Sequence, residues 1–539
     1  MKTKIIDSKN VIFFFIVVFF AYLFIAPQYG YPSDEPAEQV ILRENMMEYT
    51  YHFKGVDSLA YKYYENLGVE RSFYSVEMDH GQSAYYLFTP FLTSFTNNQD
   101  VLMVLWRLYT SLIFLMGCIC LYKIMRLLSV GQFISCITVL LYIICPRFFA
   151  EGHYNNKDMI LLSLSLCLLY SGFKTIKQTT PLNAFIFSLI GAITANTKII
   201  GLFLWGLIAV GILLHVIIRK KLNKTVIISA LVAFFSFFIF YILLTPAIWS
   251  DPLKYLQHVW ENANSFTRWS GVVLFRGVIF DYDTNPLPRY YIIYMILMTT
   301  PIYVLIFTLI GQLSALVTII KSKEKLLTNT QSLFYLIITL FWIIPIGYQF
   351  VCQTLVYNGW RHFYFVYASL AILCGVGLNT VITYFINKNK KFIMALSVLL
   401  AICILFTAGG IILNHPNQNA YYNIVGRLLS PTNGMELDYW NLSAVNAMKE
   451  LLNKEKNAPI ILGTSDPMSW HGIYNGYNVL SEKEKDKLTI VNNINAPYLF
   501  VNTTYQRIYN IEIPENYVKY LKIESYGQTI AVIYAKNSK

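Results

Sequence analysis

The chain has 539 residues, of which 56% are hydrophobic and only 13% are charged. A soluble domain of this length carries roughly 25% charged residues, so the composition excludes an ordinary soluble enzyme. The formal net charge of +12 does not indicate a nucleic-acid partner. The lysines and arginines instead lie in short clusters between apolar stretches, as the positive-inside rule requires of a membrane protein. We therefore expect an integral membrane protein surrounded by membrane lipids.

Apolar stretches of about 20 residues recur over positions 1–413, and each can cross a hydrocarbon layer of ~30 Å. We expect about eleven transmembrane helices. In chain order they lie at roughly 11–27, 101–122, 131–149, 159–174, 183–217 (two helices), 225–245, 290–320, 331–350, 362–386 and 391–413. The stretch 183–217 is too long for one helix and is interrupted at Asn196-Thr197-Lys198, which places Lys198 at a helix break.

The basic clusters predict the orientation of these helices. They lie at 2–9, 123–126, 174–177, 219–221, 321–325 and 387–391, which all fall on one side of the predicted bundle. By the positive-inside rule that side is cytoplasmic. We therefore expect a multi-pass protein of the plasma membrane with a cytoplasmic N-terminus and an extracytoplasmic C-terminus.

Two domains are predicted. Residues 1–413 form the transmembrane domain, with large outer loops at 28–100, which holds amphipathic helices, and at 246–288. Residues 414–539 have the composition of a soluble protein. Their patterns predict a helix at 443–455, strands at 458–462, 488–491 and 498–501, and a hairpin at 518–535, which together indicate a small extracytoplasmic α/β domain. The eight cysteines lie in or beside apolar segments and none lies in the C-terminal hundred residues, so we expect neither a disulfide framework nor a zinc site.

Carboxylates stand at the membrane boundary in two outer loops. Asp34-Glu35 follows the first span closely, and Asp158 directly precedes another span. Acids at this depth are costly unless they have a partner or a role. Adjacent carboxylates are able to act as a general base or to bind a divalent cation. The structural alternative is that Asp34 and Asp158 cap the helices that follow them.

Basic residues occur on the same outer side, where the positive-inside rule predicts few. Lys198 lies at the helix break, and both Arg289 and Arg361-His362 precede spans. Taken singly, each of them is a snorkelling or topological charge. Taken together, they indicate that an anionic headgroup is held near the outer carboxylates, since phosphate binds to such cations and to free backbone N–H groups.

These segments, in this order, resemble glycosyltransferase family 39 of the GT-C superfamily. That family includes the protein O-mannosyltransferases and the bacterial transferases that add aminoarabinose to lipid A. The resemblance runs through the whole membrane region and slightly beyond it. The motifs that carry it are Asp34-Glu35, Pro146-Arg147, Asn156-Lys157-Asp158, Thr197-Lys198, Pro246 to Pro252, Pro288-Arg289-Tyr290-Tyr291 with Thr300-Pro301, Arg361-His362, and Tyr421-Tyr422-Asn423 with Asp438-Tyr439-Trp440.

The resemblance implies a GT-C type fold and an inverting transfer of one sugar on the outer face of the membrane. The donor would be a polyprenyl-phosphate-linked sugar, and the acceptor a lipid, a glycan or a protein. Asp34 would be the base that deprotonates the acceptor hydroxyl, supported by Glu35 and Asp158. The donor phosphate would be held by the outer cations, which are Lys198, Arg289, Arg361 and His362.

Two departures from the family pattern bear on these expectations. The His-Pro-Pro-Leu sequence common in the first loop of relatives appears here as Asp79-His80-Gly81-Gln82, so the acceptor contacts implied for Asp79 and His80 stay open. The chain has no room for the luminal β-trefoil insertion of the eukaryotic enzymes, which places it with a bacterial branch. No metal is assigned, and a divalent cofactor stays open.

A transporter or flippase for a lipid-linked or anionic substrate is the alternative function. Transporters tend to show internal repeats and charges at the bilayer midplane. The spans of this chain carry few charges, and its two halves do not match. A binding protein that has kept the scaffold but lost activity is a further alternative.

Overall fold

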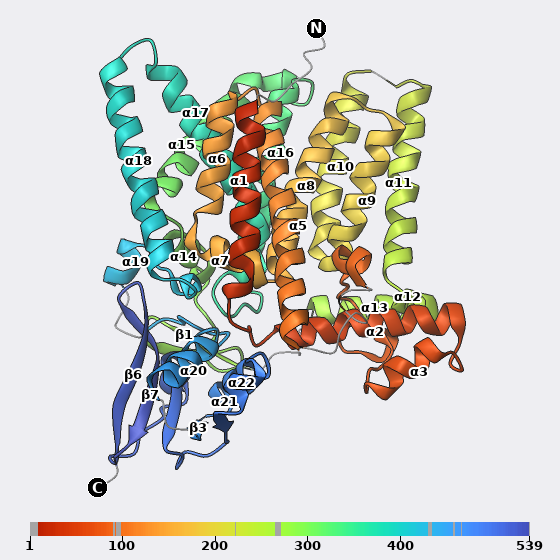
Figure 1. The fold of residues 1–539 in the computed structure, drawn as a ribbon. Coiled ribbons are helices and arrows are strands. Elements are labelled where there is room, and N and C mark those ends of the chain that lie inside the picture. The colour runs from red at the N-terminus through yellow and green to blue at the C-terminus, as the bar shows by residue number, and fades with distance from the viewer. Residues whose placement is uncertain are drawn as a thin grey trace.

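Long apolar helices that run side by side make up most of the molecule (Figure 1). The structure is a computed structural model that describes residues 9–537, apart from 90–91, 93–98, 221, 265–270, 430–433, 456–458 and 465. Among the described helices, nine are long and apolar enough to cross a membrane. They are α1 (Lys9–Ile25), α5 (Gln99–Leu127), α8 (Asp158–Lys177), α10 (Ile200–Ile218), α11 (Lys224–Leu244), α15 (Ile302–Ser322), α16 (Thr330–Cys352), α17 (Tyr367–Phe385) and α18 (Lys390–Leu413).

The two remaining predicted spans are bent or short. Helices α6 (Gln132–Ile143) and α7 (Pro146–Tyr154) are bent by 74° relative to each other, so the single helix predicted at 131–149 is wrong. Pro146 is the first residue of α7, and a proline there ends the preceding helix because its ring clashes with the turn before it. Helix α9 (Pro181–Thr197) has only 17 residues and ends at the predicted break beside Lys198. With the nine long helices, the bent pair and α9 match the eleven expected spans in order, which confirms a polytopic α-helical membrane protein.

The span predicted at 290–320 is also divided. Helix α14 (Tyr291–Thr299) ends before Pro301, and α15 begins at Ile302. The residue before a proline is disfavoured in the helical conformation, and Thr300 is indeed extended.

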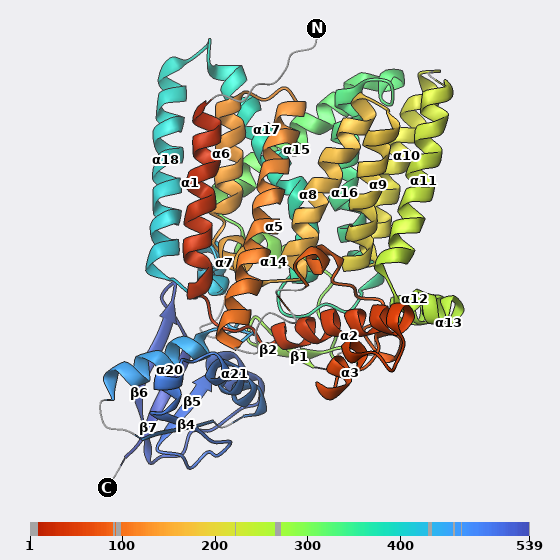
Figure 2. The same cartoon turned by 45° about the vertical axis from the view of Figure 1, so that its right-hand side comes forward.

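The outer loops form a layer across one end of the bundle (Figure 2). Helix α2, which follows α1, and the helices after α11 lie across the membrane helices rather than along them. The elements of this layer are η1 (Ala26–Gln28), α2 (Glu35–Lys54), α3 (Leu59–Asn66), η2 (Ser72–Tyr74), η3 (Ser83–Phe88), α12 (Ala247–Ser250), α13 (Pro252–Asn264), β1 (Val272–Phe275) and β2 (Val278–Asp281).

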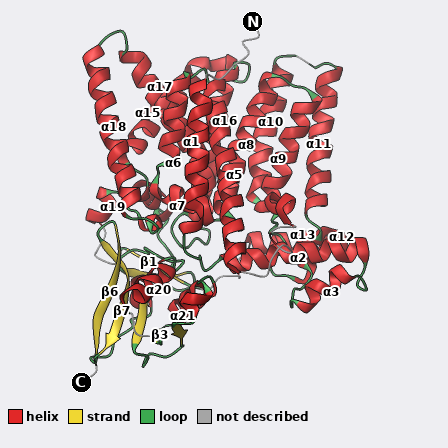
Figure 3. Cartoon of the chain, in the orientation of Figure 1, coloured by secondary structure: helices red, strands yellow, loops and turns green. Residues whose placement is uncertain are grey.

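The strands gather almost entirely in a small domain at that same end (Figure 3). Five of them form one sheet in the order β4-β3-β5-β7-β6. Strands β4, β3 and β5 are parallel, whereas β7 is antiparallel to both of its neighbours. The domain elements are α19 (Ile424–Leu429), α20 (Ser443–Lys454), β3 (Ile460–Thr464), α21 (Pro467–Asn478), α22 (Glu482–Lys485), β4 (Leu488–Ile490), β5 (Tyr498–Asn502), α23 (Thr503–Ile508), β6 (Tyr517–Ser525) and β7 (Gln528–Lys536).

The helix, the strands and the hairpin predicted for this domain are all present, with ends shifted by a few residues. The strand predicted at 458–462 is observed at Ile460–Thr464, and its predicted first residue lies outside the described residues. Helices α21 and α23 were not predicted. The small C-terminal α/β domain is therefore confirmed.

The two ends of the chain lie at opposite ends of the bundle (Figure 1). The described basic clusters at 123–126, 174–177, 321–325 and 387–391 lie at the helix ends nearest the N-terminus. The outer layer and the C-terminal domain share the other end, so residues from both are able to form one site.

Candidate active site

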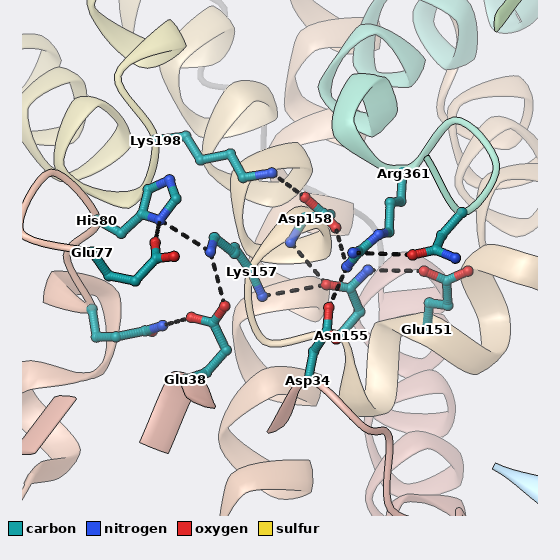
Figure 4. Close-up of polar contacts among 12 residues, drawn as sticks. Asp34, Glu38, Glu77, His80, Glu151, Asn155, Lys157, Asp158, Lys198 and Arg361 are labelled. Carbon is teal, nitrogen blue, oxygen red and sulfur yellow. Dashed lines mark hydrogen bonds and ion pairs between the residues drawn. The ribbon is translucent and has the colours of Figure 1, made fainter. Parts of the chain in front are cut away.

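Charged side chains from distant parts of the sequence meet where the bundle contacts the outer layer (Figure 4). Asp34 comes from the start of α2, Asp158 from the start of α8, and Lys198 from the turn between α9 and α10. Arg361 begins the short 3-10 helix η5 (Arg361–Val366), which leads into α17. Two acids and two cations that the sequence singled out are thus neighbours.

Asp34 does not cap the helix that it precedes. Its side chain accepts no hydrogen bond from the first turn of α2, so the structural alternative is wrong for this residue. One carboxylate oxygen, Oδ2, instead accepts a hydrogen bond of 2.6 Å from Nη1 of Arg361. The Asp34 side chain is 46% exposed, whereas that of Arg361 is 7% exposed. Asp34 therefore presents a carboxylate to the solvent side while a buried guanidinium holds it in place.

Asp158 is the buried acid of the cluster, with a side chain that is 2% exposed. Its Oδ1 lies 2.5 Å from Nζ of Lys198, and its Oδ2 lies 3.8 Å from Nη1 of Arg361. The N-cap residue of α8 is Lys157, and the backbone N–H of Asp158, the first residue of the helix, donates to Oδ1 of Asn155. The capping alternative is thus wrong for Asp158 too, and its carboxylate links the two cations.

Aromatic rings hold the Arg361 guanidinium from two sides. Its central carbon lies 5.1 Å from the ring centroid of Tyr357 and 5.1 Å from that of Trp440. The His362 ring packs edge-on against Tyr357, with the centroids 4.5 Å apart. Because Trp440 belongs to the C-terminal region, that region completes the site. The backbone oxygen of Trp440 also accepts hydrogen bonds from the backbone N–H and the hydroxyl of Ser33, the residue before Asp34.

A cavity of about 340 Å³ opens beside this cluster. This volume falls in the range of sites that bind small molecules. One part of its wall is polar and mostly charged, and it is formed by Asp34, His80, Lys157, Asp158, Lys198, Arg361 and His362. The other part is largely apolar, and it is formed by Ile199, Ile200, Pro345, Tyr348, Thr354, Leu355, Tyr357, Phe363 and Phe365. A ligand with an anionic head and a hydrocarbon tail matches this division.

A second and much smaller cavity, of about 10 Å³, also borders Asp34. Its lining is mostly polar and consists of Pro32, Asp34, Glu35, Glu38, Tyr154, Asn155, Asn156, Lys157, Arg361 and Trp440. Asp34, Lys157 and Arg361 border both cavities. The smaller cavity has about the size of one water molecule, so only the larger one has room for a ligand beside Asp34.

Lys157 was not among the predicted site residues, although it belongs to a motif that the sequence singled out. Its Nζ lies 3.0 Å from Oε1 of Glu38 and 3.2 Å from Nδ1 of His80. Burial lowers the pKa of Lys157, but Glu38 and Glu77 more than offset this, so the pKa lies above the ordinary lysine value. Lys157 therefore brings a third positive charge to the cavity.

Glu35 is engaged elsewhere. It is buried, and its Oε2 accepts a hydrogen bond from Nη1 of Arg107 on α5. Burial raises the pKa of Glu35, and the charge of Arg107 opposes that rise. The second terminal nitrogen of Arg107 donates to the backbone oxygen of Gly30 at 2.8 Å. Glu35 thus anchors the start of α2 to the bundle and borders only the smaller cavity.

Glu77, Asp79 and His80 form a separate group at the edge of the site. One ligand atom from each lies within 4.8 Å of the others, so the group is able to hold a divalent cation. His80 lines the larger cavity and hydrogen-bonds to Glu77. Burial and the charge of Lys157 lower the pKa of His80, so its imidazole is neutral at pH 7. Asp79 lines neither cavity and lies 3.6 Å from Nε2 of His258.

Arg289 lies apart from the charged cluster. Its Nη1 donates to the backbone oxygens of Phe350 and Val351, at 2.9 and 2.5 Å. These carbonyl groups belong to the last turn of α16. Arg289 lines neither cavity, and its observed role is to hold the end of that helix.

No protein-family model and no curated protein sequence matches the chain. Several solved structures are similar to it in fold, and two of them serve as examples. One is ArnT from Cupriavidus metallidurans in the apo state, with 12% sequence identity and a TM-score of 0.48 over 97% of this chain and 98% of that one. The other is the arabinofuranosyltransferase AftD from Mycobacteria, with 9% identity and a TM-score of 0.39 over 99% of this chain and 40% of that one. These likenesses concern the course of the chain alone, so function has to be argued from the side chains.

Proposed function

We propose that the protein is an inverting glycosyltransferase that moves one sugar from a polyprenyl-phosphate-linked donor to an acceptor hydroxyl. The observation that carries this proposal is the larger cavity, where Asp34 and Asp158 meet Lys198 and Arg361 beside an apolar wall. Residues of the membrane helices α10 and α16, among them Ile200 and Pro345, belong to that wall. Such a site suits a reaction between a membrane lipid and a polar acceptor.

The donor phosphate binds to Lys198 and Arg361. Both cations are largely buried and face Asp158, so they are held in place before a ligand arrives. Charge-assisted hydrogen bonds from ammonium and guanidinium groups to phosphate are about twice as strong as neutral ones. The isoprenoid chain lies against the apolar wall and continues into the bilayer, where its burial costs nothing in solvation.

The chemistry needs one base and one stabilised leaving group. The acceptor oxygen attacks the anomeric carbon from the face opposite the phosphate, and its proton passes to the Asp34 carboxylate. The new bond from carbon to the acceptor oxygen forms as the bond from carbon to the phosphate oxygen breaks. The electron pair of the broken bond stays on the phosphate, where Lys198 and Arg361 stabilise the added negative charge. A single displacement of this kind inverts the anomeric configuration.

The acceptor approaches Asp34 from the exposed side of its carboxylate, which is 46% exposed. Glu38 and Asn156 line the small cavity beside Asp34, and they are polar partners for a hydroxyl-bearing group. A lipid, a glycan or a protein carries such groups. His80 and Asp79 lie farther along the same outer loop, and they serve either the acceptor or a divalent cation.

The reaction takes place at the extracytoplasmic face of the plasma membrane. The basic clusters at the opposite end of the bundle support a cytoplasmic location for that end, by the positive-inside rule. The charged cluster lies where helices begin and end rather than in the middle of long spans, which fits surface chemistry better than transport.

Comparison of cell-surface glycans with and without the gene tests this function. In a deletion strain we expect one sugar to be missing by mass spectrometry, with the polyprenyl-phosphate sugar accumulating. A gene carrying Asp34→Asn should fail to restore that sugar, whereas Asp57→Asn, at an exposed aspartate of the same outer loop, should restore it. Full restoration by Asp34→Asn, with normal protein levels, would exclude Asp34 as the base.

A further inference from the structure

A buried carboxylate lies directly behind the charged cluster. Glu151, near the end of α7, has no exposed surface, and both of its carboxylate oxygens accept hydrogen bonds from neutral side chains. Its Oε2 accepts from the Asn155 amide at 2.8 Å, and its Oε1 accepts from the Tyr364 hydroxyl at 2.8 Å. These two donors belong to different elements of the site.

Asn155 links Glu151 to Asp158. While its Nδ2 donates to Glu151, its Oδ1 accepts the backbone N–H groups of Lys157 and Asp158, at 3.3 and 2.8 Å. An asparagine amide can rotate unless both of its ends are held. Glu151 therefore fixes the Asn155 amide, whose oxygen accepts the backbone N–H of Asp158. Asp158 is the residue that pairs with Lys198.

Tyr364 links Glu151 to the short helix that carries Arg361. It lies one turn after Arg361 in the short 3-10 helix η5. This helix has only six residues, and a 3-10 helix gains little stability from its own backbone hydrogen bonds because their geometry is poor. The hydroxyl of Tyr364 therefore helps to fix the position of the turn that carries Arg361.

We propose that Glu151 is a positioning residue that holds Asp158 and Arg361 at a fixed separation. It does not touch either of them, and it acts through Asn155 on one side and Tyr364 on the other. This inference rests on the proposed function, because it assigns to Glu151 the geometry of the donor-phosphate site. A carboxylate is a costly group to bury, and an apolar side chain of similar size packs with less loss. The burial of Glu151 is explained by its hydrogen bonds, which join the start of α8 to η5.

Hydrogen exchange tests the link without any ligand. The full-length protein is placed in lipid nanodiscs, and exchange is followed by mass spectrometry in peptides that cover 155–161 and 361–366. Glu151→Leu removes both hydrogen bonds at similar volume, and we expect exchange in both peptides to become roughly tenfold faster. Tyr364→Phe should loosen only 361–366, and Asn155→Ala only 155–161. These single-sided variants keep the test decisive if Glu151→Leu folds poorly.

The conservative variant Glu151→Gln should behave almost as the natural protein. Its amide oxygen accepts from Asn155, and its amide nitrogen donates to the oxygen of Tyr364, so both links survive. Unchanged exchange of both peptides in Glu151→Leu would overturn the proposal. It would equally be overturned if Tyr364→Phe and Asn155→Ala each left their own peptide unchanged.

Binding of farnesyl phosphate, a short polyprenyl phosphate, separates this inference from the proposed function. We expect Glu151→Leu to weaken its affinity roughly tenfold and Glu151→Gln to leave it unchanged. Failure of the natural protein to bind farnesyl phosphate would count against the glycosyltransferase, while the exchange data would still decide the role of Glu151. Normal binding by Glu151→Leu, beside weakened binding by a variant of Lys198, would reject the positioning role alone.

Discussion

Replacement of Lys198 by methionine is the most direct test of the phosphate site. The lysine Nζ lies 2.5 Å from Oδ1 of Asp158, and the lysine side chain is 15% exposed. Methionine keeps most of the length of the side chain and removes only the charge and the donors. Asp158 keeps Arg361 as a cationic neighbour at 3.8 Å, so the buried carboxylate is not left alone.

The expected loss follows from one charge-assisted hydrogen bond to phosphate. Such a bond contributes about 1.5–3 kcal/mol. Since every 1.4 kcal/mol changes an equilibrium constant tenfold, the dissociation constant of farnesyl phosphate should rise by a factor of about 10 to 150. Lys198→Arg, which keeps the positive charge, should lose much less.

Affinity is measured in nanodiscs by thermophoresis, at one fixed salt concentration because ionic contacts are screened by salt. Lys174→Met is the matched control, because Lys174 is also a lysine but lies in the last turn of α8, at the end of that helix away from Asp158. An unchanged affinity in Lys198→Met, with the control also unchanged, would refute the assignment of the phosphate to this cavity.

Three further predictions concern the other acids. Asp34→Asn should abolish sugar transfer and leave farnesyl phosphate bound at least as tightly; retained transfer would contradict the base role. Glu35→Gln should act on folding, because it leaves the Arg107 guanidinium buried without its carboxylate, at a cost of about 3–5 kcal/mol. A lowered temperature of thermal unfolding checks this, and normal stability with lost transfer would instead favour a catalytic Glu35. Glu436 is buried two residues before Asp438, and this burial raises its pKa to about 8. The folded state therefore keeps a proton on Glu436 at pH values where the unfolded state, with the ordinary pKa of 4.5, has already released it. Stability should therefore fall between pH 5 and pH 8, by about 1.4 kcal/mol per pH unit, and Glu436→Gln should flatten that slope in unfolding experiments at several pH values; an unchanged slope would contradict the assignment.

The membrane helices were predictable because a span has to be apolar over about 20 residues. The break at Lys198 was visible for the same reason, since Asn196 and Thr197 interrupt an apolar run. The bend at Pro146 was hidden, because the residues that follow, Phe148 and Phe149, continue the apolar run beyond it. Hydropathy alone therefore gives the number and order of the helices, but not where each one bends.

The site was predictable only in part. Acids and cations at the membrane boundary were marked by their cost, and Asp34, Asp158, Lys198 and Arg361 do meet. Their partners were not visible, because pairs such as Asp34 with Arg361 join residues 327 positions apart. Arg289 also precedes a span, as Arg361 does, yet its guanidinium donates hydrogen bonds to backbone carbonyls at the end of α16 and lies outside the cluster. Glu151 could have been found, since an acid that directly follows Phe148-Phe149-Ala150 is costly in that position.

The contact between Ser33 and Trp440 joins residues 407 positions apart, which is most of the length of the chain. The Trp440 ring beside Arg361 therefore reaches it only after ribosomes have made the last membrane helix, α18, and the segment beyond it. A nascent or prematurely terminated polypeptide carries both carboxylates and both cations, yet its guanidinium lacks one of its two aromatic covers. The order of synthesis thus delays completion of the charged cluster until the C-terminal region has folded against it.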